Sequence, residues 1–290
     1  MVNLRRSDLS GRRRRHSRDH ESAGPDRSLG VILTTVDEVE VVVAHHDRAT
    51  VRVGDVFLKI DPDQARVGIE IEAMSRAPIP TPQILWREPP ALALARVPGS
   101  PLGRLGAPST ASSAAWSAAG QLIRVLHDAP LPPWSGRTRD EIAIELDQEC
   151  AWLDRSGLVS PAVIACNRTL AASALREWTP AFIHGDLQLD HVFVSGDEIT
   201  GIIDWSEAGP GDAFYDLATL TFGHPERLGD VVAGYGGGVD VDVVRGWWSV
   251  RGLRGVRWLI EHGFDPDAPG CELDVLRAQA TSLQGRMPRA

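Results

Sequence analysis

The sequence predicts an α+β protein with a small, strand-rich first part and a larger, mainly helical second part. Three observations lead to this expectation. Short β-branched and apolar runs between residues 39 and 60 are separated by turn signals. Two more such runs follow before residue 97. From residue 112 onward, longer segments bounded by capping residues, prolines and glycines replace the strands, which is the pattern of helices.

The first part is expected to contain one antiparallel sheet and one helix. The first three strands form a meander in which Gly54-Asp55 is the tight turn before the third strand. A helix follows over residues 63–76, because apolar residues recur there at i, i+4 and i+7. Prolines between residues 78 and 82 end it. The strands are expected at residues 39–44, 49–53, 56–60, 83–86 and 91–96.

The second part is expected to be mainly helical, interrupted by one hairpin. Proline and glycine clusters separate the helical segments, as after residue 130 and at residues 236–238. The helices are expected at residues 112–127, 139–153, 160–177, 217–222, 225–234, 240–262 and 272–283.

The hairpin is predicted to gather three polar side chains. Two β-branched runs, residues 192–194 and 199–203, flank a Ser-Gly-Asp turn signal. Asp186 and His191 precede the first run, and Asp204 follows the second. Because a tight hairpin brings its outer ends together, these side chains should converge. Two carboxylates and an imidazole at one point repel or lose solvation unless a bound cation offsets the cost.

A single lysine stands out among the cations. The chain has 30 Lys and Arg residues, and Lys59, at the end of the third expected strand, is the one lysine. Lysine is a compact point charge that suits a phosphate oxygen, whereas the arginine fork is wide and planar. Glu70 lies at the edge of the apolar face of the following helix and Glu72 points away from it, so we expect Glu70 to pair with Lys59.

Four polar motifs follow one another in the second part of the chain. They are His184-Gly185-Asp186, His191 five residues after Asp186, Ile202-Ile203-Asp204-Trp205, and Gly211-Asp212 followed by Tyr215-Asp216-Leu217-Ala218. Their order resembles the aminoglycoside phosphotransferase family. One departure is that the metal-ligand position, most often Asn in that family, is His191, as in its 2″-aminoglycoside and macrolide branches.

The resemblance implies a bilobal, protein-kinase-like fold that binds ATP or GTP. Residues 28–97 would be the nucleotide-binding N-lobe. Residues 98–290 would be the C-lobe, with the catalytic loop, the metal site and the acceptor-binding helices. Val97-Pro98-Gly99 resembles the family's hinge between lobes. The turn that covers the phosphates in kinases is usually rich in Gly or Ser, and here residues 45–48 have neither.

The resemblance also implies a role for each motif residue. Asp186 would orient the acceptor hydroxyl toward the γ-phosphorus. His191 and Asp204 would hold Mg²⁺, with Mn²⁺ as an alternative because one ligand is an imidazole. Lys59 would contact the α- and β-phosphates and be oriented by Glu70. The backbone near Arg96 and Val97 would contact the purine. His184 and Asp216 would brace the loop by hydrogen bonds.

Composition narrows the partners and the compartment. The net charge is −9, although residues 1–27 hold eight arginines against four acids and are expected to be a disordered basic tail. The acidic remainder argues against nucleic acid as a partner and is compatible with a small, cationic, hydroxyl-bearing acceptor. The sequence has no run of eighteen apolar residues, so no membrane-spanning helix is expected. Three scattered cysteines suit a reducing, cytoplasmic location.

The sequence leaves more than one acceptor and more than one reaction class open. Some members of the family phosphorylate aminoglycosides, macrolides and other antibiotics and so confer antibiotic resistance. Others phosphorylate metabolites such as choline or homoserine. A metal-dependent hydrolase could use the same His and Asp residues, but it would leave Lys59 and the strand-rich lobe without a role. A non-catalytic nucleotide-binding protein is the third reading, favoured by the atypical first turn and opposed by the complete Lys, Asp and metal positions.

Overall fold

The computed structural model describes residues 39–44 and 48–286, and all of these belong to one compact unit. The expected basic tail at residues 1–27 lies outside the described residues, as do the turn residues 45–47. No helix in the described part of the chain is long and apolar enough to span a membrane.

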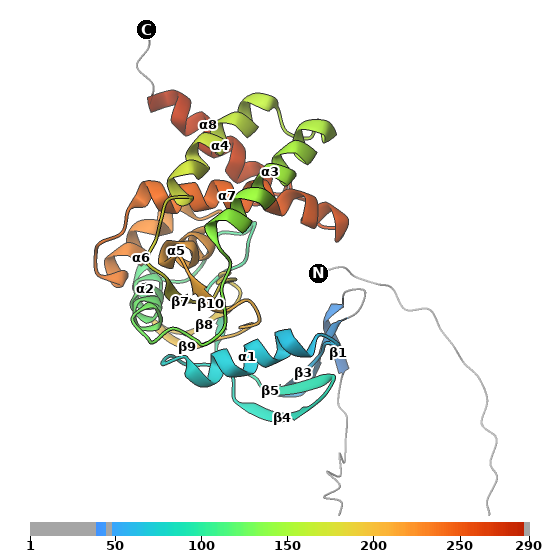
Figure 1. Cartoon of the computed structure of the whole chain (residues 1–290). Helices are drawn as coiled ribbons and strands as arrows, with labels where there is room; N and C mark the ends of the chain where they lie inside the picture. The colour runs from blue at the N-terminus through green and yellow to red at the C-terminus, as the bar shows by residue number, and fades with distance from the viewer. Residues whose placement is uncertain (1–38, 45–47, 287–290) are drawn as a thin grey trace, which may run out of the picture. The chain divides into compact units, whose positions relative to one another are not determined.

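The small lobe is a five-stranded antiparallel sheet with one helix beside it (Figure 1). The strand order is β1-β2-β3-β5-β4, so β3 lies at the centre. Lys59 on β3 is opposite Thr50 on one side and Leu92 on the other. The elements are β1 (Val39–Ala44), β2 (Ala49–Val53), β3 (Val56–Ile60), α1 (Gln64–Arg76), β4 (Ile84–Glu88) and β5 (Ala91–Ala95).

Helix α1 turns its apolar face and Glu70 inward. The Asp63 side chain caps the helix by accepting bonds from the N–H groups of Ala65 and Arg66. Val67 and Met74 are buried on the same face as Glu70. A buried carboxylate needs a partner, and the position of α1 beside β3 supplies one from the sheet.

A glycine at the start of the large lobe allows a close backbone approach. Gly99 has a φ of +94°, and a Cβ there would lie 2.3 Å from the carbonyl oxygen of Val194. Only glycine fits such a contact and such a φ. The next two residues form β6 (Ser100–Pro101), which pairs with β8 (Val192–Ser195). The connection between lobes is therefore bonded to the predicted hairpin.

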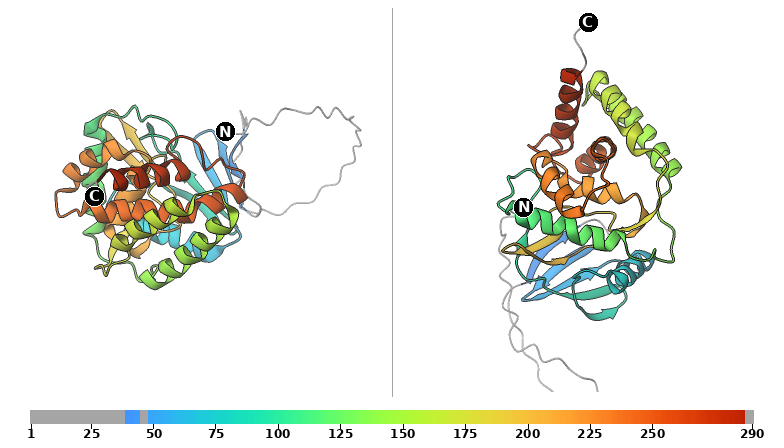
Figure 2. Two further views of the ribbon diagram at one scale, coloured as in Figure 1. Left: turned by 90° about the horizontal axis from the view of Figure 1, so that it is seen from above. Right: turned by 90° about the vertical axis from the view of Figure 1, so that its left-hand side faces the viewer.

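The large lobe is built around helix α7, which packs against α3, α4, α5 and α8 (Figures 1 and 2). Helix α2 packs mainly against α6. The helices are α2 (Ser113–His127), α3 (Arg139–Ser156), α4 (Pro161–Ala174), α5 (Ala213–Thr221), α6 (Leu228–Tyr235), α7 (Val241–Glu261) and α8 (Glu272–Arg286), with a 3₁₀ turn at Pro225–Arg227. The expected fold, a small antiparallel lobe with one helix and a larger helical lobe, is confirmed.

Two small sheets complete the large lobe. The expected hairpin is present as β8 and β9 (Glu198–Ile202), and β6 joins it as a third strand. A second pair, β7 (Ala181–Ile183) with β10 (Gly209–Gly211), was not expected from the sequence. These two strands have three residues each, too few for an alternating pattern to be visible.

Several helix boundaries differ by three or four residues from the sequence expectation, and capping explains two of them. Helix α3 runs three residues further than expected and ends at Gly157, whose φ of +67° is a left-handed C-cap. Helix α5 starts four residues earlier, because the Asp212 side chain accepts a bond from the N–H of Phe214. Helix α4 ends at Ala174, and no glycine or proline marks that end.

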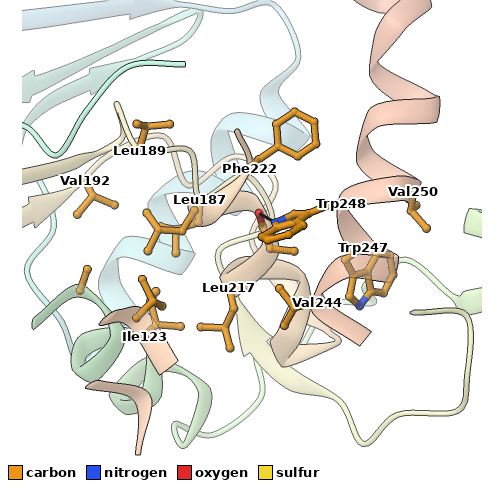
Figure 3. Packing of buried hydrophobic residues seen from close by; sticks show 14 of the residues in the cluster. Ile123, Leu187, Leu189, Val192, Leu217, Phe222, Val244, Trp247, Trp248 and Val250 are labelled. Atoms are coloured by element: carbon orange, nitrogen blue, oxygen red, sulfur yellow. Dashed lines mark hydrogen bonds between the residues drawn. The ribbon is translucent and has the colours of Figure 1, made fainter. Parts of the chain in front are cut away.

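Large side chains from α5, α7 and the loop after β7 form the centre of the core (Figure 3). Trp247 and Trp248 are buried, and Trp248 Nε1 donates to the carbonyl oxygen of Ala218 at 3.0 Å. Leu187 and Leu189 are also buried. Because these leucines alternate with polar residues of the predicted catalytic loop, the core anchors that loop.

Candidate active site

A buried carboxylate fixes the backbone of the His184-Gly185-Asp186 loop. Asp216 on α5 accepts bonds from the N–H of His184 at 2.7 Å and from the N–H of Gly185 at 3.0 Å. Gly185 has a φ of +81°, and a Cβ there would lie 2.1 Å from the carbonyl oxygen of Glu207. The loop conformation therefore requires both the glycine and the acceptor beneath it.

His184 is buried and bonded at both ring nitrogens. The N–H of Asp186 donates to His184 Nδ1 at 3.3 Å, so Nδ1 is an acceptor. His184 Nε2 is 3.0 Å from the carbonyl oxygen of Ile203, which only accepts, so Nε2 carries the proton. Burial lowers the pKa of His184 and outweighs the nearby carboxylate of Asp216. A neutral imidazole thus ties the loop to the end of the hairpin, as expected for a bracing residue.

Asp186 emerges from this loop with its carboxylate partly exposed. Gln188 Nε2 donates to both carboxylate oxygens, at 3.0 Å each. Arg251 on α7 approaches Oδ1 to 3.6 Å. The carboxylate is therefore held in a defined orientation and still has a surface free for a ligand.

His191 presents one unprotonated nitrogen to Asp204. Its Nδ1 lies 2.8 Å from the carbonyl oxygen of Asp186 and must donate to it, which leaves the lone pair on Nε2. That Nε2 is 3.9 Å from Asp204 Oδ2. Burial lowers the pKa of His191, but the carboxylates of Asp186 and Asp204 outweigh it and raise the pKa above its usual value.

Asp204 is held in an unusual backbone conformation between His191 and Lys59. Its φ is +66°, and it is the one non-glycine residue with positive φ among residues 39–44 and 48–286. Such strain is common where a side chain has a specific task. Burial alone would raise the pKa of Asp204, but Lys59 and His191 hold it well below its usual value.

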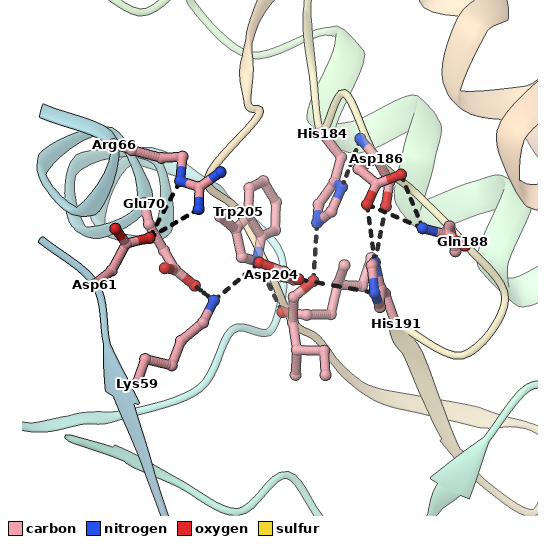
Figure 4. Close-up of polar contacts among 12 residues, drawn as sticks. Lys59, Asp61, Arg66, Glu70, His184, Asp186, Gln188, His191, Asp204 and Trp205 are labelled. Atoms are coloured by element: carbon pink, nitrogen blue, oxygen red, sulfur yellow. Dashed lines mark hydrogen bonds and ion pairs between the residues drawn. The ribbon is translucent and has the colours of Figure 1, made fainter. Parts of the chain in front are cut away.

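Lys59 bonds one carboxylate from each lobe (Figure 4). Its Nζ lies 2.6 Å from Glu70 Oε1 and 2.8 Å from Asp204 Oδ1. Glu70 is only 3% exposed, so it faces the lysine rather than solvent. Burial lowers the pKa of Lys59, and the two carboxylates outweigh it and raise the pKa. The expected Lys59–Glu70 contact is confirmed.

The predicted metal ligands suit an ion that arrives with a nucleotide. Within the described ranges, no group of three or more His, Cys, Asp and Glu side chains is arranged to hold a metal by itself. His191 Nε2 and Asp204 Oδ2 provide two donors on facing side chains. Mg²⁺ commonly takes one or two protein ligands and completes its shell with water and substrate phosphates. Two donors fit such an ion and do not fit a closed structural site.

Two adjoining cavities lie between the lobes on the side of Lys59. The larger, about 380 Å³, has an apolar wall that includes Phe57, Leu94 and Val97, and Arg96 borders it. The smaller, about 240 Å³, is more polar and is lined by Lys59, Asp186, His191 and Asp204, together with Arg48 and Arg66. An apolar slot beside a polar pocket that contains Lys59, Arg48 and Arg66 matches the base and the phosphates of a nucleotide.

A third cavity, of about 720 Å³, opens on the other side of Asp186. Aromatic side chains form part of its wall, and Tyr215 and Trp178 each pack edge-on against Trp247. Of the acids on α3, Glu141 and Glu145 line the cavity. Glu145 is paired with Arg137 and Arg254. Glu207 makes no hydrogen bond or ion pair with the described residues; it is exposed and lines the cavity.

Several residues of this region were missed in the sequence. Arg66 lines the polar 240 Å³ pocket and is held by Asp61. Its Nη2 lies 2.8 Å and its Nε 3.2 Å from Asp61 Oδ2. In a chain with 29 arginines, one more carries no signal. Gln188 was also missed, although its place two residues after Asp186 was visible. Trp258 was missed as well: it is 44% exposed and lines both the 720 and the 240 Å³ cavities.

Comparison with known proteins supplies a family and a fold. A model of the phosphotransferase enzyme family matches residues 40–253. Viomycin phosphotransferase from Streptomyces vinaceus is 33% identical over 184 residues, which is 57% of this chain and 61% of the relative. The matched part therefore spans less than two thirds of that relative's length.

Solved structures share the fold at lower identity. APH(2″)-IIIa with GDP and kanamycin has a TM-score of 0.64 at 20% identity, covering 86% of this chain and 94% of that one. The aminoglycoside phosphotransferase APH(3″)-Id from Streptomyces rimosus has a TM-score of 0.57 at 24% identity, covering 74% and 92%. A macrolide 2′-phosphotransferase from Brachybacterium faecium has a TM-score of 0.58 at 18% identity, covering 87% and 92%.

Proposed function

The chain belongs to the phosphotransferase enzyme family, and on that premise we propose that it transfers the γ-phosphoryl group of ATP or GTP to a hydroxyl of a small, cationic acceptor. The observation that carries the proposal is the position of Asp186. Its carboxylate lines both the polar 240 Å³ pocket that contains Lys59 and the 720 Å³ cavity. A group at that boundary can contact an acceptor hydroxyl on one side and face a phosphoryl group on the other.

The nucleotide would lie on the side of the small lobe. Its base would enter the apolar slot beside Val97, next to the backbone of Arg96, and its phosphates would reach Lys59. Glu70 orients the lysine from behind. This assigns residues 28–97 to nucleotide binding and residues 98–290 to the metal, the catalytic loop and the acceptor. Arg48 and Arg66 add two further cations to the phosphate pocket, where the first turn lacks glycine.

The chemistry asks mainly for positioning and charge neutralisation. The acceptor oxygen forms a bond to the γ-phosphorus. The bond from that phosphorus to the oxygen that bridges it to the β-phosphate breaks, and the nucleoside diphosphate leaves with that oxygen. Asp186 would accept the hydrogen bond of the acceptor hydroxyl and take its proton. Mg²⁺, held by His191 and Asp204, would neutralise phosphate charge when bound. His184 and Asp216 would keep the loop in place without reacting.

The acceptor cavity supports a cationic substrate. Asp212 is neutralised by Arg176 at 2.7 Å, and Glu145 by two arginines. Asp186 also lines the cavity, and Arg251 lies 3.6 Å from its Oδ1. Glu141 and Glu207 line the cavity without an ion pair among the described residues. Aromatic walls beside them favour ligand cations by their negative ring faces. A neutral or anionic acceptor would leave these acids without a counter-charge.

The test is a nucleotide-consumption screen with ATP and with GTP against a panel of acceptors. Viomycin comes first, because the relative from Streptomyces vinaceus is named for it, and aminoglycosides, macrolides and amino alcohols follow. Consumption that depends on an acceptor, with a phosphorylated product by mass spectrometry, is the expected result. Phosphate release without any acceptor would indicate a hydrolase, and nucleotide binding without turnover would indicate a binding protein.

A further inference from the structure

Arg251 contacts Asp186 from the protein side of the catalytic loop. It lies on α7, and its Nη1 is 3.6 Å from Asp186 Oδ1. The arginine side chain is 16% exposed, whereas the Asp186 side chain is 28% exposed. Arg251 borders none of the three cavities described above, while Asp186 borders two of them. The arginine therefore meets the carboxylate from behind and has no route to a bound acceptor or nucleotide.

The guanidinium is held by charge and by an aromatic ring rather than by neutral hydrogen bonds. Its Cζ lies 5.2 Å from the ring centroid of Phe222. Its Nε finds no hydrogen-bond partner among the described residues, and neither does Oε2 of the buried Glu272. Burial lowers the pKa of Arg251, but the charges of Asp186 and Glu272 raise it. A buried cation in such surroundings depends on its carboxylate partners.

Three side chains contact the Asp186 carboxylate, and they approach it differently. Gln188 Nε2 is equidistant from Oδ1 and Oδ2, at 3.0 Å each, so it does not distinguish the two oxygens. Arg251 approaches Oδ1 to 3.6 Å, and His191 Nδ1 lies 3.9 Å from Oδ2. The arginine is therefore the cation on the Oδ1 side of the carboxylate.

We propose that Arg251 is a positioning residue that holds the Asp186 carboxylate from its Oδ1 side and so fixes the orientation in which it meets the acceptor hydroxyl. The inference rests on the proposed function, because Asp186 needs an acceptor hydroxyl to orient. Arg251 acts through Asp186 and touches no substrate. A misplacement of a reacting group by about 1 Å can cost about 10²-fold in rate, so the loss of this anchor should be visible in kcat.

A double-mutant cycle tests whether Arg251 acts through Asp186. The four proteins are the wild type, Arg251→Met, Asp186→Asn and the double variant, assayed with the acceptor found in the screen. Arg251→Met should lower kcat by about 10- to 100-fold in the wild-type background and by less than about twofold in the Asp186→Asn background. The nucleotide KM should stay within about twofold. Losses that multiply would overturn the proposal, since the arginine would then act independently of Asp186.

Two further variants separate charge from packing. Arg251→Lys keeps a cation and should recover part of the loss; a lysine variant no better than the methionine variant would overturn the assignment to charge. Arg245→Met is the matched control on the same helix, because Arg245 pairs with Asp242 at 3.5 Å and lies outside the site. Its kcat should equal the wild-type value, and a comparable loss there would overturn a specific role for Arg251.

A structural measurement decides the case even if no acceptor is phosphorylated. Failure of the wild type in the screen would count against the proposed function alone. Crystal structures of the wild type and Arg251→Met should then show one Asp186 conformer in the first and a rotated or split carboxylate in the second. An unchanged single conformer in Arg251→Met would overturn the anchoring role. If the methionine variant does not fold, the comparison is made with Arg251→Lys.

Discussion

Lys59 Nζ lies 2.8 Å from Asp204 Oδ1, although 145 residues separate them in the chain. The lysine comes from the central strand of the small lobe, and the aspartate follows the hairpin of the large lobe. The contact brings the predicted phosphate ligand and the predicted metal ligand together before any nucleotide is bound. Substitutions on either side of this contact should therefore affect nucleotide use first.

Lys59→Ala should raise the nucleotide KM and lower kcat, together by about tenfold or more in kcat/KM. The alanine removes the cation from the phosphate pocket and leaves Glu70 and Asp204 without their shared partner. Steady-state kinetics with varied nucleotide measure the effect. Lys59→Arg should recover little, because a planar fork does not replace a point charge between two carboxylates. Wild-type turnover of the alanine variant at saturating nucleotide would contradict the role of Lys59.

Asp186→Asn should reduce kcat by about 10² or more, the usual scale for a positioned acid–base group. The side chain is nearly isosteric, and the amide of Gln188 can turn to keep its bond, so the thermal midpoint should hardly move. Asp197→Asn, in the hairpin turn, is a control that should behave as the wild type. Near-normal rates for Asp186→Asn would mean that another residue orients the acceptor.

His191→Asn should retain more activity than His191→Ala. Asparagine offers Mg²⁺ a carbonyl oxygen, which suits this ion, whereas alanine leaves Asp204 to bind with water. Excess Mg²⁺ should partly rescue the alanine variant. In the wild type, the Mg²⁺ requirement should rise as pH falls through the pKa of His191, because the imidazolium cannot bind metal. Burial lowers that pKa, and the neighbouring carboxylates raise it above about 6.5.

The measurement is a Mg²⁺ titration of activity for the three proteins at several pH values. Superimposable Mg²⁺ curves for the wild type and His191→Ala would remove His191 from the metal site. Nucleotide KM at saturating Mg²⁺ is the control, and it should differ little between the wild type and His191→Asn.

Glu207→Gln should raise the KM of a cationic acceptor several-fold and leave the nucleotide KM unchanged. The carboxylate faces the acceptor cavity without an ion pair among the described residues, so it is available to a substrate cation. Added salt should weaken acceptor binding in the wild type more than in the variant. Glu72→Gln, on the outer face of α1, is the control. Equal salt dependence in both proteins would show that Glu207 does not meet the acceptor.

Asp216→Asn should destabilise the protein by about 1–3 kcal/mol, because its amide cannot accept both backbone bonds and a buried donor is left unpaired. Urea unfolding measures the loss. Asp140→Asn, on the exposed surface of α3, is the control and should be within about 0.5 kcal/mol of the wild type. An unchanged midpoint for Asp216→Asn would mean that the loop does not depend on this carboxylate.

The local elements could be predicted because their signals are local. The β8–β9 hairpin was visible as two β-branched runs around a Ser-Gly-Asp turn, and its convergence of Asp186, His191 and Asp204 followed from hairpin geometry alone. The Lys59–Glu70 contact was visible from strand and helix phases. Each of these inferences uses only neighbours in sequence or one turn.

The rest of the site depends on contacts that leave no local pattern. Arg251 reaches Asp186 only because α7 packs beside the catalytic loop, and nothing in its neighbourhood distinguishes it from the other arginines of that helix. The aromatic wall at Trp134, Trp178 and Tyr215 is assembled from three separate segments. Strands β7 and β10 pair with each other across 25 or more residues and are too short to be recognised singly.

The hairpin that carries His191 and Asp204 is also bonded to the connection between the lobes. Thr200 Oγ1 donates to the carbonyl oxygen of Pro98 at 2.5 Å, and the N–H of Ile202 donates to that of Pro80 at 3.0 Å. A swing of the small lobe that preserves these bonds must turn about the hairpin as its pivot. Val97 of the base slot and the predicted metal ligand Asp204 lie beside that pivot, so a movement of the small lobe would leave their spacing nearly unchanged.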